Sequence, residues 1–251
     1  MHGHSAFAVA LPSRDVLAFA ASSCGMVVFV ESVKALAAHG VCSSVVARKC
    51  MHIGCGPLFV LTWPLFTPRG ASIASLVPLA MTLKFAATGL GVLKSRHALD
   101  EVRAMSRTGD PAELLRGPLL YGVAFCALTR FCWRSVPGVA AMMALCMGDG
   151  LAEVFGRIYG RARLPWSPTK SWAGSAAFLL SAVASSAAFA ELFRVWGWSA
   201  ATTGELVGPL VLACAAGCAV ESLPLRDVDN LLVPFVVAAI LSRLTSPTAR
   251  L

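Results

Sequence analysis

The segment from Gly148 to Ser175 combines carboxylates, glycines and basic residues in a chain that is otherwise mostly apolar. Its acids and glycines recur at intervals of four, three and four residues, at Asp149, Glu153, Gly156 and Gly160. This spacing places them on one face of a helix. The basic residues that follow are Arg157, Arg161, Arg163 and Lys170. Carboxylates hold divalent cations, and Lys and Arg bind phosphate, so the segment predicts a triphosphate site.

The two acids, Asp149 and Glu153, are the expected Mg²⁺ ligands. Asp149 lies at the end of an apolar run, and a charged side chain at the centre of a bilayer costs about 2.5–3.5 kcal/mol even on lenient insertion scales. The alternative is a helix N-terminal acid at the interface, which the helix dipole favours by about 0.3–1 kcal/mol. We favour the functional interpretation, because an idle carboxylate inside the bilayer would be poorly tolerated.

The phosphates are expected to meet side-chain cations and a loop. Lys170, with Arg157 or Arg161, supplies the positive charge. Backbone N–H groups between Ser171 and Gly174 supply further donors, since a glycine lets the backbone approach a ligand closely. Which carboxylate, if any, takes the proton of an attacking hydroxyl stays open.

The pair Gly156 and Gly160 forms a G-x-x-x-G pattern, which in membrane proteins usually marks close packing of two helices. That interpretation stays open here. The two acids on the same face, and Lys170 and Ser171 downstream, favour a nucleotide-binding surface instead. The pattern of a P-loop is absent, so the sequence predicts a phosphate site of another kind.

This segment resembles the shared motif of phytol kinase and farnesol kinase, in the wider group that includes dolichol kinase and the CDP-diacylglycerol synthases. The family pattern is an acidic GDG start, a G-x-x-x-G helix, a Pro-containing loop and then KSWAGS. The matching residues here are Gly148, Asp149, Gly150, Ala152, Glu153, Gly156, Gly160, Pro165, Lys170, Ser171, Trp172, Ala173, Gly174 and Ser175. One departure is Glu153, which stands where the family has Asp and is longer by one methylene.

Three further blocks resemble phytol kinase in the same order along the chain, namely RKCMHIGCGP (48–57), SRTGDPAELLRGPL (106–119) and ESLPLRDVDN (221–230). The resemblance makes Glu221 and Asp229 candidates for a second metal or substrate contact. Without the resemblance, these residues indicate an interfacial loop with a helix cap. His52, beside Arg48 and Lys49, either contacts phosphate or belongs to a basic cluster that attracts anionic lipid.

The composition indicates an integral membrane protein. Of its 251 residues 57% are hydrophobic and 14% are charged, and the mean hydropathy is +0.72. We expect an all-α polytopic helix bundle, forming one lipid-kinase domain over residues 1–251, with seven to eight transmembrane segments. The net charge of +8 does not indicate a nucleic-acid partner, because the basic residues form no aromatic-interleaved stripe. The expected partners are the lipid bilayer, a lipid substrate and a nucleoside triphosphate.

Eight apolar runs can be read, at about 16–38, 54–66, 71–93, 118–132, 136–152, 173–196, 205–220 and 230–246. Several are shorter than the ~20 residues of a perpendicular span, so they must be tilted, extended or re-entrant. If all cross, the loops 39–53, 94–117, 153–172 and 221–229 share one side and carry most of the Lys and Arg. By the positive-inside bias this side is cytosolic, or stromal in a plastid. All four motif blocks open onto it.

The resemblance implies transfer of the γ-phosphoryl of CTP to phytol, in a route from phytol toward tocopherol. The alternatives are a kinase for farnesol, geranylgeraniol or dolichol, a cytidylyltransferase that makes a CDP-lipid, and a small membrane transporter. A transporter is disfavoured because its charges would line a path through the membrane rather than gather on one side. The first 15 residues are too short for a convincing transit peptide. A chloroplast membrane location is therefore implied by the resemblance alone.

Overall fold

The computed structural model describes residues 13–95, 98, 100, 102, 105–106, 108–225 and 227–245. Parts of the second and third of the three further blocks therefore lie outside the described residues. Within them the chain is helical apart from one short hairpin, which confirms the all-α class. The first half contains α1 (Ser13–Ala38), α2 (Ser44–Leu61), η1 (Trp63–Leu65), α3 (Ala71–Ala74), α4 (Leu76–Gly89), η2 (Pro111–Leu115) and α6 (Gly117–Phe131). The second half contains α7 (Val136–Met143), η3 (Ala144–Gly148), α8 (Asp149–Tyr159), β1 (Arg163–Leu164), β2 (Ser167–Ser171), α9 (Trp172–Val195), α10 (Thr203–Glu221) and α11 (Asp229–Leu244).

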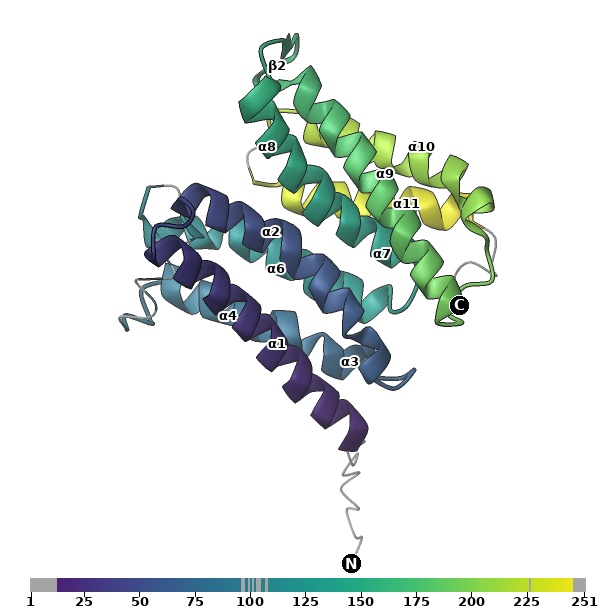
Figure 1. The fold of residues 1–251 in the computed structure, drawn as a ribbon, viewed down its shortest axis with the longest axis horizontal. Helices are drawn as coiled ribbons and strands as arrows, with labels where there is room; N and C mark the ends of the chain where they lie inside the picture. The colour runs from purple at the N-terminus through teal and green to yellow at the C-terminus, as the bar shows by residue number, and fades with distance from the viewer. Residues whose placement is uncertain are drawn as a thin grey trace, which may run out of the picture.

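The central helix of the bundle is α7, and all of its eight residues are buried. Its sequence, VPGVAAMM, is apolar on every side, which is the pattern of a helix that other helices surround. It packs against α9 and α11 on one side and against α2 and α6 on the other. Figure 1 shows α1, α2, α4 and α6 as one group and α8 to α11 as another, with α7 between them.

Five helical segments are long and apolar enough to cross a membrane within the described part of the chain. They are Ser13–Ala38, Ala71–Gly89, Val136–Tyr159, Trp172–Val195 and Thr203–Glu221. The shorter or more charged helices α2, α6 and α11 correspond to the remaining predicted runs. The protein is thus a polytopic helix bundle, while seven to eight crossings stay a prediction.

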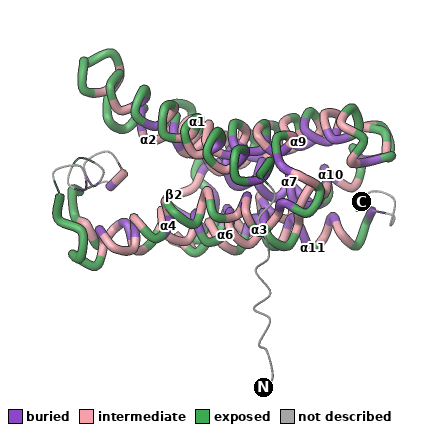
Figure 2. The backbone as a smooth tube through the Cα atoms, turned by 90° about the horizontal axis from the view of Figure 1, so that it is seen from below, coloured by how far each residue is buried: buried purple, intermediate pink, exposed green. Residues whose placement is uncertain are grey.

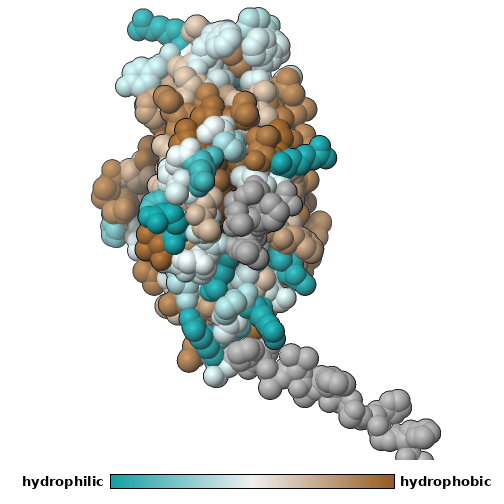
Figure 3. Space-filling model, turned by 90° about the vertical axis from the view of Figure 1, so that its right-hand side faces the viewer, coloured by the Kyte–Doolittle hydropathy of each residue, from teal (hydrophilic) through white to brown (hydrophobic). Residues whose placement is uncertain are grey.

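The surface suits a lipid environment. Large apolar side chains stand exposed on the candidate spans, among them Leu17 and Val28 on α1 and Leu180 on α9. Brown, hydrophobic surface covers much of the face in Figure 3, with hydrophilic side chains in separate patches. Figure 2 shows that exposed residues line the outside of the helix groups, while buried ones gather where the groups meet.

Two of the expected loops are largely structured. The segment predicted as the loop 39–53 is helical from Ser44, because the Ser43 hydroxyl caps α2 by accepting a hydrogen bond of 3.3 Å from the N–H of Val46. The expected loop 153–172 continues α8 to Tyr159 and then forms the antiparallel hairpin of β1 and β2. Both corrections share a cause, since charged residues such as Lys and Glu are good helix formers and hydropathy alone ends a helix too early.

Candidate active site

Among the described residues, a cavity of about 1210 Å³ lies where the two helix groups meet. Its lining comes from α1, α2, α4, η2, α6, α8, β1, β2, α9, α10 and α11. Its charged and polar lining includes Arg48, Lys49, His52, Asp149, Glu153, Arg157, Lys170, Glu221, Asp229 and Asn230. Pro168 and Thr169 of the hairpin line it and are exposed, so this end opens to water.

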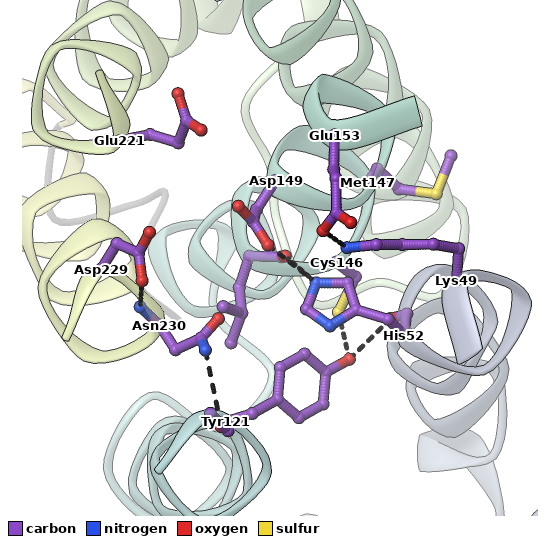
Figure 4. A network of polar contacts seen from close by, with 12 residues as sticks. Lys49, His52, Tyr121, Cys146, Met147, Asp149, Glu153, Glu221, Asp229 and Asn230 are labelled. Carbon is purple, nitrogen blue, oxygen red and sulfur yellow. Dashed lines mark hydrogen bonds and ion pairs between the residues drawn. The ribbon is translucent and has the colours of Figure 1, made fainter. Parts of the chain in front are cut away.

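Lys170 on β2 forms the centre of an ionic cluster. Its Nζ lies 2.5 Å from Oε1 of Glu221, at the end of α10, and 3.5 Å from Oδ2 of Asp229, at the start of α11. Burial disfavours the charge of the Lys170 ammonium, but the attraction and hydrogen bond of Glu221, with Asp149 and Asp229, outweigh it and raise the pKa of Lys170. Figure 4 shows the carboxylates of Asp149, Glu221 and Asp229 directed toward one space.

The hairpin is what brings Lys170 to these acids. Arg163 on β1 donates from Nη1 to the carbonyl oxygen of Thr169 at 3.2 Å, which closes the hairpin. Trp166 at its turn donates from Nε1 to the Ser222 hydroxyl at 3.1 Å, just beyond α10. These contacts tie the KSWAGS block to the last block along the chain, more than fifty residues away.

Asp149 follows a wide π-helical turn, η3, which separates it from the buried central helix. Turns of this kind occur frequently at functional sites. His52 of α2 lies with Nε2 3.1 Å from Oδ2 of Asp149 and 3.1 Å from the carbonyl oxygen of Leu145. Because both partners are acceptors, the Nε2 atom must carry the hydrogen. His52 therefore orients the Asp149 carboxylate at the polar end of the cavity.

Glu153 faces a different set of partners from Asp149. Its carboxylate pairs with Lys49, with Arg157 at 2.7 Å and with Arg48 at 3.8 Å. Figure 4 shows it turned toward Lys49 rather than toward Asp149. The Mg²⁺ role of Glu153 stays a prediction, while these ion pairs give it a structural role that joins α2 to α8.

The glycines of the motif let α8 approach the start of α9. A Cβ on Gly174 would lie 2.9 Å from the carbonyl oxygen of Ala152. A Cβ on Gly156 or Gly160 would lie 3.2 Å or 2.6 Å, respectively, from the hydroxyl oxygen of Ser171. Ser171 caps α9, because its hydroxyl accepts a hydrogen bond of 3.1 Å from the N–H of Gly174. Close helix packing, the alternative interpretation of the G-x-x-x-G pair, is thus what the contacts show, and a role in nucleotide binding stays a prediction.

Most of the predicted site residues line the one cavity, namely Asp149, Glu153, Gly156, Arg157, Lys170, Ser171, Gly174, Glu221 and Asp229. Two of them do not. Gly160 follows the last residue of α8 and lies against the side chain of Ser171. Arg161, the next residue, is exposed. The structure therefore offers Arg157, and not Arg161, as the arginine of the α8 segment at the site.

Two residues of the site were not foreseen as contacts. Tyr121 of α6 donates its hydroxyl to the carbonyl oxygen of His52 at 2.8 Å, and that hydroxyl also lies 3.1 Å from Sγ of Cys146. Its ring lies 4.7 Å from the His52 ring, centroid to centroid. Tyr121 stands next to the GPL of the second block, which was the available signal. Cys146 offered none, since it reads as a small buried apolar residue.

Known proteins resemble the chain over most of its length. It is 37% identical over 204 residues, 79% of this chain, to a probable chloroplastic phytol kinase 2 of Oryza sativa subsp. japonica. It is 35% identical over 206 residues, 80% of this chain, to a chloroplastic farnesol kinase of Arabidopsis thaliana. The chain spans 66% of the length of each of these two relatives, just under two thirds.

A third relative is matched more fully. A chloroplastic phytol kinase 1 of Arabidopsis thaliana is 32% identical over 236 residues, which are 91% of this chain and 77% of that protein. No family model and no solved structure matches the chain. Identity at this level over this length, with the motif residues gathered at one cavity, shows that the chain belongs to the phytol kinase and farnesol kinase family, whose members are named as kinases that act on an isoprenoid alcohol.

Proposed function

We propose that this protein phosphorylates an isoprenoid alcohol, phytol in the first place, with CTP as the donor. One observation carries the proposal: a single cavity joins the cluster around Lys170 to an apolar region between membrane-spanning helices. A triphosphate and a lipid alcohol can meet only where water and bilayer both reach the protein. This cavity offers both, with the exposed hairpin at one end and Val27 and Phe85 at the other.

The polar end has the chemistry of a divalent cation site. Mg²⁺ is usually held by one or two carboxylates together with the phosphates of its substrate. Among the described residues no group of three or more His, Cys, Asp or Glu is arranged to hold a metal alone, so substrate oxygens would complete the coordination. Asp149, with Glu221 or Asp229, fits this need. Mg²⁺ would supply neutralisation of the charge on the phosphates.

The other side chains of the site bind and orient the two substrates. In the transfer the alcohol oxygen forms a bond to the γ-phosphorus, the bond from that phosphorus to the bridging oxygen breaks, and CDP and a proton leave. Such reactions depend mostly on in-line placement and on neutralised charge. Lys170 lines the cavity at the polar end, together with Arg48, Lys49 and Arg157, and these side chains supply cations for the phosphates. The stacked rings of Tyr121 and Phe125 form an apolar wall of the cavity beside this end.

The identity of both substrates rests on the family. CTP is implied by the resemblance of the motif, and phytol and farnesol are in the names of the relatives. Phytyl phosphate, the product, would serve the salvage of phytol toward tocopherol. The relatives are named chloroplastic, which supports a chloroplast membrane as the location.

The test is a substrate comparison with purified protein in detergent and Mg²⁺. Phytol should be phosphorylated with CTP faster than with ATP, and farnesol and geranylgeraniol should be accepted comparably or less well. Preference for a much longer polyprenol such as dolichol, or for ATP, would contradict the substrate assignment. Formation of a CDP-lipid would identify a cytidylyltransferase instead.

A further inference from the structure

The apolar part of the cavity lies between two pairs of helices. Within the first helix group, Figure 2 shows α1 beside α2 and α4 beside α6, as two separate pairs. The side chains that line this part come from all four of these helices. They are Met26, Val27, Val30, Phe59, Val77, Met81, Phe85 and Phe125.

The interior depth of this region is limited. Phe59 and Phe125 are 2% and 4% exposed, belong to the main core and lie with ring centroids 6.5 Å apart. Their rings therefore close the inner end of the apolar part of the cavity. His52, which contacts Asp149, and Phe59 lie seven residues apart on α2, or about 10 Å along the helix axis. That depth is less than the extended tail of farnesol or phytol. A tail that begins beside Asp149 must therefore turn before it ends.

Two apolar residues of the cavity lining are exposed on candidate membrane spans. Val27 on α1 lines it and is 52% exposed, and Ala80 on α4 lines it and is also exposed. Both residues lie in segments long and apolar enough to cross a membrane. A residue that both lines the cavity and faces outward stands at a rim. Val27 and Ala80 thus mark a lateral opening between α1 and α4 onto the bilayer.

We propose that the isoprenoid tail leaves the protein through this opening, so that only its proximal part is bound inside. This inference rests on the proposed function and adds the path of the lipid. The isoprenoid tail is the expected occupant of the apolar region, because this region shares one cavity with Asp149 and Lys170. It meets the bilayer at Val27 and Ala80. An apolar chain is stabilised on leaving water for either protein or lipid, so the distal tail loses nothing by lying in the bilayer.

Substitution at the rim tests the proposal with matched controls. Val27→Trp and Ala80→Trp place a large ring at the opening, while Val28→Trp and Leu83→Trp place it on the same two helices at exposed positions outside the cavity lining. The assay is phosphorylation of phytol with CTP in detergent, with KM measured for each substrate. Val27→Phe and Ala80→Phe repeat the test with a smaller ring if a Trp variant fails to insert.

The expected result is a KM for phytol raised about fivefold or more in the rim variants, with an unchanged KM for CTP and control variants like the wild type. If the wild type is active and the rim and control variants have the same KM for phytol, the proposed path of the tail is wrong, while the proposed function stands. A higher KM for CTP alone would also overturn it. A wild-type protein that phosphorylates no isoprenoid alcohol would instead refute the proposed function.

Discussion

Asp149 carries the largest share of the proposed chemistry, since it stands at the end of the buried central segment and points into the polar end of the cavity. Asp149→Asn removes the charge and nearly preserves the shape. We expect kcat/KM for phytol to fall about 100-fold or more, because a charge that acts on the reacting phosphates is lost. Steady-state kinetics on purified protein measures this.

The control is Asp110→Asn, which changes an exposed helix-capping acid outside the cavity lining and should leave kinetics unchanged. Membrane insertion should match the wild type in both variants. Activity of Asp149→Asn within about threefold of the wild type would refute the metal-site assignment.

Lys170 has two roles that can be separated. Lys170→Met should raise the KM for CTP more than the KM for phytol, since it removes a cation from the phosphate end alone. It should also lower the melting temperature, because Glu221, whose side chain is 5% exposed, loses its partner.

The double variant Lys170→Met/Glu221→Gln separates the two effects. It should recover part of the stability, since the more deeply buried of the two carboxylates that Lys170 neutralises no longer carries a charge, without recovering the KM for CTP. A normal KM for CTP in the single variant would show that the phosphates are held elsewhere.

At the scale of elements, the ion pairs of Glu153 join α2 to α8 across the helix groups. Glu153→Ala would leave Lys49, Arg48 and Arg157 facing one another, so we expect a lower melting temperature and reduced activity. Glu153→Asp, with the acid that the family has, should be tolerated. Glu31→Ala is the matched control, because Glu31 is exposed and pairs with Lys34 within one helix. Equal activity of the Ala and Asp variants would mean that the carboxylate of Glu153 has no role in activity and that the residue serves only in packing.

The elements also show where sequence reasoning succeeds. The apolar runs predicted α1, α4, α9 and α10 well, because hydropathy reports directly on which residues can face lipid. It could not predict that α2 begins at Ser44 or that α8 runs to Tyr159, since charged residues at the interface are helical without being apolar. The π-helical turn before Asp149, which packs against α9, has no local signal in the sequence.

At the scale of the whole molecule, the sequence predicted that separate motif blocks open onto one side of the membrane. The structure gathers them more tightly, with Lys170 against Glu221 and Asp229, and His52 against Asp149. The pairing of Lys170 with Glu221 could not be predicted, because it depends on a hairpin that the Trp166 contact with Ser222 holds in place. Pairings across fifty residues follow from tertiary packing rather than from spacing.

The central claim is that the γ-phosphoryl of CTP passes to the hydroxyl of an isoprenoid alcohol. Purified protein in detergent with Mg²⁺ and phytol is supplied with CTP labelled at either the γ- or the α-phosphorus, and the lipid fraction is measured for label. We expect label in the lipid from γ-labelled CTP alone, and about 100-fold less of it with Asp149→Asn. Label from the α-position would identify a cytidylyltransferase, and label from neither would contradict the assignment of this protein as a kinase.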